Sequence, residues 1–177
     1  MKRSFYSLLM LALFLSLTAC GSKSTAPSPS VSEYETSDDT PDGVQRMHEY
    51  HYADTLQAYG KIYRYDIRRT SSDDLPQVRD EEGTVFADNA YVLHIEQGGQ
   101  AFFSRRFVKS DFDAYLSADF RAKGLLDGMM CDKSLSGITF AVSVSLPQSD
   151  MMEPLLLHVN KDGSIAIERD NRAELEL

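Results

Sequence analysis

The stretch Ile138–Leu146 reads ITFAVSVSL, alternates apolar side chains with small or polar ones, and is followed directly by Pro147. Successive side chains of a β-strand point to opposite faces of a sheet, so a period of two places one face of this stretch against a core. Because proline has no N–H to donate to a sheet ladder, Pro147 ends the run. The stretch predicts one strand of an antiparallel β protein.

Similar runs flank this strand and are separated by turn signals. Downstream, the apolar positions 155, 157 and 159 and the positions 165 and 167 lie on either side of residues 160–163, which read as a hairpin turn. Upstream, runs lie at 55–59, 62–69, 91–96 and 101–108, with turns at 60–61, 80–83 and 97–100. The run 101–108 has aromatic residues on both faces, which predicts a central strand.

A helical insert is predicted between these two groups of strands. Ser110, with Asp113 three residues later, resembles a capping box, and Gly124 provides a stop. We expect one helix, or two short ones, from Asp111 to about Lys123, whereas residues 44–52 fit a short helix or an extended lead-in. The whole pattern predicts a mostly β fold with minor α content, in which seven or eight strands form an antiparallel meander, either a barrel or a sandwich.

The first 19 residues predict an export signal. Lys2 and Arg3 precede the apolar run 8–17, which is too short to span a bilayer, and residues 17–20 (LTAC) resemble the lipobox of bacterial lipoproteins. We expect residues 1–19 to be removed as a lipoprotein signal peptide and Cys20 to carry the acyl chains. Cys131 is then the one remaining thiol, and its position after two methionines predicts a buried small hydrophobe.

Residues 20–43 predict the lipidated cysteine and a disordered tether. The segment is rich in serine, proline and acidic residues and has few apolar side chains that could offset the entropy of ordering. As a flexible coil it would span roughly 25 Å. Residues 44–177 then form a single β-rich globular domain. Because Gly21, and not an aspartate, follows Cys20, we expect a cell-envelope location at the outer membrane, and because no acidic run follows Cys20 directly, we expect the domain to face the periplasm.

The charge balance argues against two classes of partner. The chain has a formal net charge of −9, and since Lys2 and Arg3 are the only charged residues among the first 19, the remainder carries −11. An acidic surface repels nucleic-acid backbones and anionic head groups, so the expected membrane contact is the lipid on Cys20. The sequence contains no phosphate-binding glycine loop and no paired-cysteine motif, and we predict no cofactor and no metal.

A series of short matches spans the chain after the tether: Arg46-Met47, Gly60-Lys61 with Tyr63, Leu75-Pro76, Asp88-Asn89, Asp111-Phe112, Asp127-Gly128, Ser143-Val144-Ser145, Pro154-Leu155 and Asp162-Gly163. Their order resembles an uncharacterised lipoprotein family of the Bacteroidales that carries a domain of unknown function. The resemblance implies an envelope lipoprotein with a β-rich fold. It implies no activity, and no functional residue is carried over from it.

Arginines are the candidates for a binding face. Arg64, Arg68 and Arg69 lie in one predicted strand, and Arg105 and Arg106 lie in another. A sheet face that gathers them would either be laced with cross-strand charge pairs or hold a carboxylate or an anionic sugar. Two histidines are also out of phase with the apolar residues of their strands. The candidate ligand-face residues are therefore Arg64, Arg68, Arg105, His94 and His158.

We expect a non-enzymatic envelope lipoprotein that binds a small-molecule ligand or an envelope protein through its β domain. One alternative is a barrel-type carrier that holds a small apolar molecule among Tyr63, Tyr65, Phe102 and Phe103. A hydrolase that uses Ser143 or Ser145 with Asp150 and His158 is another, although the nucleophile elbow is absent. Residues 48, 51 and 54, two histidines and an aspartate, would share a helical face as metal ligands can, or form a plain polar face.

Replacing the proposed lipid attachment residue tests the anchor. Cys20→Ala is expected to give a soluble periplasmic protein, because the thiol that accepts the diacylglyceryl group is lost. Fractionation of cells into membrane and soluble pools, followed by mass spectrometry of the parent chain, measures the outcome. A variant that stays in the membrane pool, or a parent chain without added lipid, would contradict the assignment.

Overall fold

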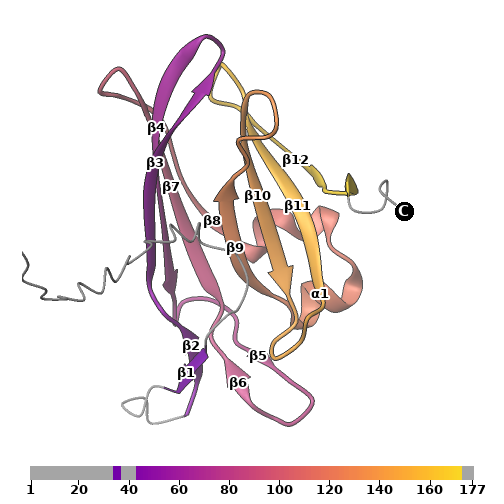
Figure 1. Ribbon diagram of the computed structural model, residues 1–177. Helices are drawn as coiled ribbons and strands as arrows, with labels where there is room; N and C mark the ends of the chain where they lie inside the picture. Colours follow the sequence, from indigo (N-terminus) through magenta and orange to yellow (C-terminus); the bar gives the residue numbers. More distant parts are fainter. Residues whose placement is uncertain (1–33, 37–42, 173–177) are drawn as a thin grey trace, which may run out of the picture.

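The computed structural model describes residues 34–36 and 43–172, and its strands form three four-stranded sheets (Figure 1). Sheet A contains, in order, β1 (Tyr34–Thr36), β2 (Gln45–Met47), β6 (Val85–Phe86) and β5 (Val78–Arg79). Sheet B contains β3 (Tyr50–Ala58), β4 (Lys61–Ser71), β7 (Asn89–Gln97) and β8 (Gln100–Val108). Sheet C contains β12 (Ile165–Arg169), β11 (Met152–Val159), β10 (Ile138–Ser145) and β9 (Leu125–Cys131).

Sheets B and C are antiparallel and pack against each other as the two layers of a sandwich (Figure 1). Apolar side chains of both inner faces form one core, in which the Tyr65 ring meets the Phe140 ring edge-on with centroids 5.7 Å apart. Within the described residues the sheets do not close into a barrel. The predicted mostly β fold with minor α content is confirmed, and the sandwich is the architecture that forms.

Strand β4 shows how the sequence pattern sets the layers. Tyr63, Tyr65 and Ile67 are buried at alternate positions, and the arginines at 64 and 68 between and beside them are exposed. Tyr59 and Gly60 form the two-residue loop that leads into the strand, with φ angles of 52° and 74°. Positive φ at both loop residues is what a type I′ hairpin turn needs, so the predicted hairpin forms, with its turn at residues 59–60 and not at 60–61.

Strand β8 differs from its prediction as a central strand, because it lies at the edge of sheet B. The register between β7 and β8 shifts between Ile95 and Glu96, so that Phe102 is an extra residue in the β8 ladder. A bulge of this kind lets consecutive side chains lie on the same side of a sheet. Phe102 and Phe103 therefore both pack against the core without the strand being central.

The predicted helical insert forms two short pieces, a 3₁₀ helix η1 (Lys109–Tyr115) and a helix α1 (Ala118–Lys123). The predicted cap at Ser110 does not form, because Asp111 accepts the backbone N–H of Val108 at 2.9 Å. Phe112 and Phe120 point from these pieces into the core, which positions the insert against the sandwich. Among the described residues, neither piece has the length and apolar character that a membrane-crossing helix requires.

Residues 44–52 are extended, as β2 and the start of β3, so the helical reading of this segment is wrong. Strand β1 falls inside the predicted tether and pairs with β2. Sheet A lies at one end of the sandwich (Figure 1), where Val78 and Phe86 bury Leu125 of sheet C. The predicted signal peptide and Cys20 lie outside the described residues.

Strand β9 is not predicted by the alternation, because Asp127 and Gly128 interrupt its apolar pattern. The ladder places Val144 opposite Leu126 and Ser143 opposite Gly128, which leaves Asp127 as an extra residue in a bulge. The Ser143 hydroxyl donates to the Asp127 carboxylate at 2.7 Å. A Cβ at position 128 would lie 2.1 Å from the Ser143 Oγ, so this hydrogen bond requires glycine there.

A buried polar cluster joins sheets B and C beside this bulge. The Asp88 carboxylate accepts the backbone N–H groups of Asn89 at 2.8 Å and of Leu126 at 2.9 Å. The Asn89 side chain donates to the Leu126 carbonyl at 3.0 Å. Lys109 donates to the Gly124 carbonyl at 2.7 Å and lies 4.0 Å from Asp88. Buried polar groups cost free energy unless they are paired, and here the pairings that involve Leu126 and Gly124 also connect segments that are distant in sequence.

Gly128→Ala tests the close approach at the bulge. The added methyl group is expected to displace the Ser143 hydroxyl and to lower the free energy of unfolding by about 1–3 kcal/mol. Urea unfolding measures the cost. In a Ser143→Ala background the same change should cost less, because the hydroxyl is already absent. Equal costs in both backgrounds would contradict the contact.

Asp127→Asn tests a buried carboxyl. Burial raises the Asp127 pKa, although the Ser145 and Ser143 hydroxyls oppose the shift. A raised folded-state pKa gives a contribution to stability that is complete below the ordinary value of 3.8 and is lost as pH rises through the folded-state value. The stability of the variant relative to the parent should therefore increase as pH rises from 3.8 toward neutrality.

A matched control is available at an exposed carboxyl with the opposite shift. The Ser164 hydroxyl and backbone N–H lower the pKa of Asp162, so the ionised form adds stability above the ordinary pKa. Asp162→Asn should therefore lose stability relative to the parent as pH rises. Urea unfolding across the same pH range measures both variants, and parallel trends for the two would contradict the assignment.

Candidate functional site

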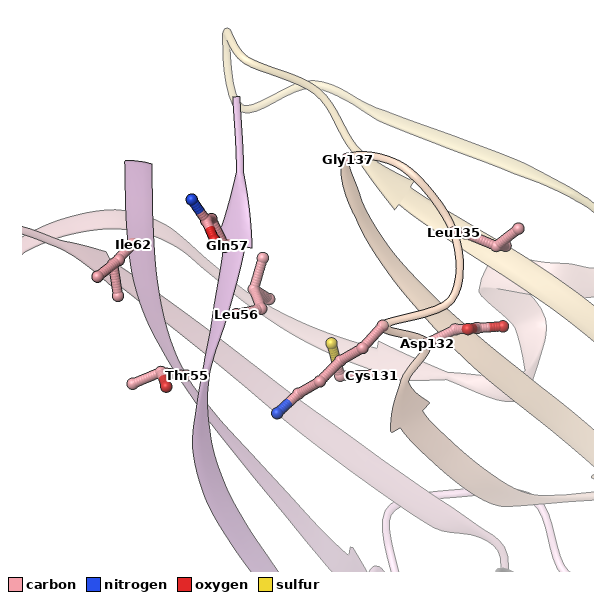
Figure 2. Close-up of a pocket in the computed structure, with 9 residues that line it drawn as sticks. Thr55, Leu56, Gln57, Ile62, Cys131, Asp132, Leu135 and Gly137 are labelled. Atoms are coloured by element: carbon pink, nitrogen blue, oxygen red, sulfur yellow. The ribbon is translucent and has the colours of Figure 1, made fainter. Parts of the chain in front are cut away.

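Two open grooves are candidates for a binding site. Groove 1 has a volume of about 420 Å³ and lies between β3 and the loop that follows β9, at the open edge of the sandwich (Figure 2). Groove 2 has a volume of about 410 Å³ and lies on the outer face of sheet B. Their side chains differ in charge and in pairing, and these differences separate the two candidates.

Groove 1 contains the free thiol of Cys131. Figure 2 shows the sulfur on the side of Leu56, whereas Asp132 points away from β3. Burial raises the pKa of the Cys131 thiol to about 11, although a hydrogen bond with the Tyr65 hydroxyl opposes the shift. The thiolate is the nucleophilic form of cysteine, so this protonated thiol is not an activated nucleophile at neutral pH.

An ion pair crosses the edge beside groove 1. The Asp54 carboxylate of β3 accepts the Lys133 ammonium at 2.6 Å and the backbone N–H of Thr55 at 2.7 Å. Strand β3 is an edge strand of sheet B, and an edge strand can offer its backbone N–H groups to another strand. The Asp54 carboxylate already accepts one of them, the N–H of Thr55. The charged groups at this edge are therefore already paired.

The outer face of sheet B arranges its side chains in rows across the strands. His51 pairs with Arg68 across the strands, Arg68 with Val92, and Val92 with Arg106, so one row of side chains runs from β3 to β8. The next two rows contain Asp66 opposite His94, and Arg64 opposite Glu96. The charged and titratable members of these rows form the basic face: Arg64, Arg68, Arg106, His51, His94, Asp66 and Glu96.

Asp66 lies at the centre of the basic face. Its carboxylate contacts the His51 Nε2 at 2.5 Å and accepts the Arg68 Nε at 3.0 Å. Partial burial acts to raise the Asp66 pKa, but the hydrogen bonds from His51 and Arg68 outweigh it and hold the pKa below its usual value. Asp66 is therefore ionised at neutral pH. Arg68 uses one donor in this contact, and within the described residues its terminal nitrogens make no hydrogen bond and are available to a ligand.

Arg64 and Arg106 carry charges that have no partner among the described residues. Both are exposed, and within the described residues neither guanidinium makes a hydrogen bond or an ion pair. Glu96 lies opposite Arg64 in register but contacts His94, with 3.3 Å between its Oε1 and the His94 Nε2. Two unpaired guanidinium groups on one face of an acidic protein attract anions from solution.

The structure brings three of the predicted ligand-face residues together, Arg64, Arg68 and His94, and does not bring Arg105 to the same face. Arg105 pairs with the buried Leu93 in the β7–β8 ladder, so its side chain leaves the edge strand on the core-facing side of the sheet. Its guanidinium pairs with Asp111 at 2.8 Å and lies over the Phe107 ring, 5.0 Å from its centroid.

His158 lies in β11 of sheet C, so it does not approach His94 of sheet B. Its Nδ1 contacts the Thr139 hydroxyl at 3.0 Å, and its Nε2 contacts Glu168 at 3.2 Å. Ser143 donates instead to Asp127. The structure therefore shows no contact between this serine and this histidine, as a hydrolytic triad would require.

The residues at 48, 51 and 54, considered above as possible metal ligands, do not share one face in the structure. His51 contacts Asp66, whereas Asp54 contacts Lys133. Residues three apart on a strand point to opposite faces, unlike residues three apart on a helix. Among the described side chains, no group of three or more histidine, cysteine or acidic residues is arranged as metal ligands.

The aromatic residues that the carrier hypothesis places around a ligand pack against other rings and do not line a barrel cavity. Tyr63 packs on Phe102 with ring centroids 5.2 Å apart, and Phe103 stacks on Phe107 at 6.4 Å. Tyr65 is buried against Phe140 of the opposite sheet. These rings fill the sandwich interior, which argues against a carrier of the barrel type.

Sequence reasoning misses His51 as a member of the basic face and leaves Arg106 out of the final candidates. His51 shares a face with Arg68 because residues 44–52 are extended, and the pattern alone leaves that segment undecided. Arg106 precedes the buried Phe107, so alternation from that residue assigns Arg106 to the outer face. That signal is present in the sequence.

No curated protein matches this chain. A family model described as a domain of unknown function, DUF4738, matches residues 30–167. The matched segment includes sheets A and B in full and both grooves. The chain therefore belongs to the DUF4738 family, a family whose domain has no known function.

Proposed function

We propose that this protein is a lipid-anchored lipoprotein of the cell envelope and a non-enzymatic module that binds a carboxylate-bearing ligand or partner through the basic face. The observation that carries the proposal is the placement of the guanidinium groups of Arg64, Arg68 and Arg106 on one sheet face. Two of them, those of Arg64 and Arg106, have no partner within the described residues.

The charge of the rest of the chain supports an anionic ligand at this face. The chain has a formal net charge of −9, so its surface as a whole repels anions, whereas the basic face gathers three guanidinium groups. A guanidinium group presents parallel N–H donors that match a carboxylate in geometry as well as in charge. The face therefore favours carboxylates over neutral groups.

The state of the nucleophilic side chains supports binding without catalysis. The Cys131 thiol has a raised pKa, and the Ser143 hydroxyl donates to a carboxylate and not to a histidine. Nucleophilic catalysis needs a deprotonated nucleophile or one paired with a base. Neither residue meets that condition in this arrangement.

The N-terminal sequence supports the anchor and the location. The lipobox-like residues 17–20 follow an apolar run, and acyl chains on Cys20 would hold the domain beside a bilayer. The tether would let the basic face meet periplasmic or membrane-bound partners without contact between the domain and the lipid.

A binding assay with the natively purified full chain in non-ionic detergent tests the proposal. Polyglutamate is expected to bind and neutral dextran is not. The double variant Arg64→Gln/Arg106→Gln should weaken polyglutamate binding about tenfold, because each exposed charge pair contributes up to about 1 kcal/mol. Isothermal titration measures the affinity.

The control variant is Arg169→Gln, which removes an exposed arginine from β12 of sheet C. It changes the net charge by one unit, as Arg64→Gln and Arg106→Gln each do as single variants, so a comparison of these three single variants separates the effect of position from the effect of net charge. Polyglutamate binding that survives in the double variant, or that falls equally in the control, would contradict a site on the basic face.

A further inference from the structure

Resting on the function proposed above, we infer that the partner of the basic face is an extended acidic peptide segment of another protein. The segment would cross strands β4, β7 and β8, with one acidic side chain at Arg64 and another at the pair Arg68 and Arg106. Recognition of acidic motifs by clustered arginines is an established physical mode of peptide binding.

The register of sheet B sets the distance between these acidic side chains. Arg64 lies opposite Glu96 and Arg106 lies opposite Val92, so the two arginines flank β7 from either side and are offset along it. With about 3.3 Å per residue and about 4.8 Å between strands, their Cα atoms are about 16 Å apart. Because side chains of a strand stand roughly perpendicular to the sheet, two separate carboxylates fit these positions better than one, and an extended peptide covers this distance in about five residues.

The two acids of the basic face determine where the carboxylates of a ligand can lie. Asp66 is paired with His51 and Arg68, and Glu96 contacts His94, so the middle of groove 2 already contains negative charge. Like charges placed directly opposite each other are destabilising. The face is therefore expected to bind acids that are separated by neutral residues more tightly, for each carboxylate engaged, than a continuous run of acids such as polyglutamate.

The remaining residues of groove 2 suit a peptide better than a sugar. Val92 is 39% exposed and lies between Arg68 and Arg106 in its row, where it offers an apolar contact to a ligand side chain. Tyr65 is the only tyrosine, phenylalanine or tryptophan in the lining, and its ring faces Phe140 in the core. The groove thus lacks the aromatic lining that sites for small cyclic ligands use.

Fluorescence anisotropy with labelled peptides tests the spacing, with the full chain in non-ionic detergent. The main probe is a Ser/Gly peptide with two glutamates about five residues apart. One control probe has the same composition with adjacent glutamates, and a second has a single glutamate. The spaced peptide is expected to bind about fivefold more tightly than either control, since it can engage both ends of the face.

Variants connect this advantage to named residues. In Arg64→Gln the spaced and single-glutamate peptides should bind equally, because one end of the site is lost. A second version of the spaced peptide has leucine in place of the serine beside the second glutamate, and it should bind the parent chain more tightly because Val92 offers an apolar contact. In Val92→Ser the leucine and serine versions should bind with equal affinity. Arg169→Gln should leave all peptide affinities unchanged. Equal affinities of the spaced and adjacent peptides for the parent chain would overturn the inference.

The outcomes also separate this inference from the proposed function. Polygalacturonate that binds in an arginine-dependent manner while no peptide binds would overturn the peptide assignment and leave the proposed function standing. If neither polyglutamate, polygalacturonate nor any peptide binds, both proposals are overturned.

Discussion

Burial of Tyr63, Tyr65 and Ile67 against sheet C is the contact on which the rest of the structure depends. These residues occupy alternate positions of β4, so Arg64 and Arg68 must lie on the outer face of the same strand. A shift of one residue would place guanidinium groups in the core and tyrosines in water, which costs several kcal/mol for the unpaired charge alone. The burial that stabilises the sandwich thus also orients the basic face.

This alternation of inward-facing and outward-facing side chains also decides how much of the site can be predicted from the sequence. Arg64, Arg68 and His94 are predicted together because each lies out of phase with the apolar residues of a regular strand. Arg105 does not join them, because β8 contains a bulge at Phe102 and parity counted from the aromatic residues is ambiguous there. The face a residue occupies in β8 depends on its pairing with β7, a tertiary contact that no local pattern contains.

Elements that do not follow a simple period are the ones that sequence reasoning misses. In β9, Asp127 and Gly128 interrupt the apolar alternation, but a bulge places them within the ladder and Asp127 accepts a hydrogen bond from the Ser143 hydroxyl. The strands of sheet A have two or three residues each, which is too short to show alternation. At the helical insert, Asp111 caps the chain at Val108, and its carboxylate also pairs with Arg105 of β8, a contact that the capping pattern alone does not contain.

The pairing at the edge of sheet B is consistent with the proposal that side chains, and not a strand edge, bind the partner. Asp54 caps the backbone N–H of Thr55 and pairs with Lys133, so the edge of β3 offers less to an added strand. Binding by exposed arginines is weak for each contact and sensitive to salt. A protein anchored to a bilayer as proposed meets its partners at a raised effective concentration, so several weak contacts are enough for binding that remains reversible.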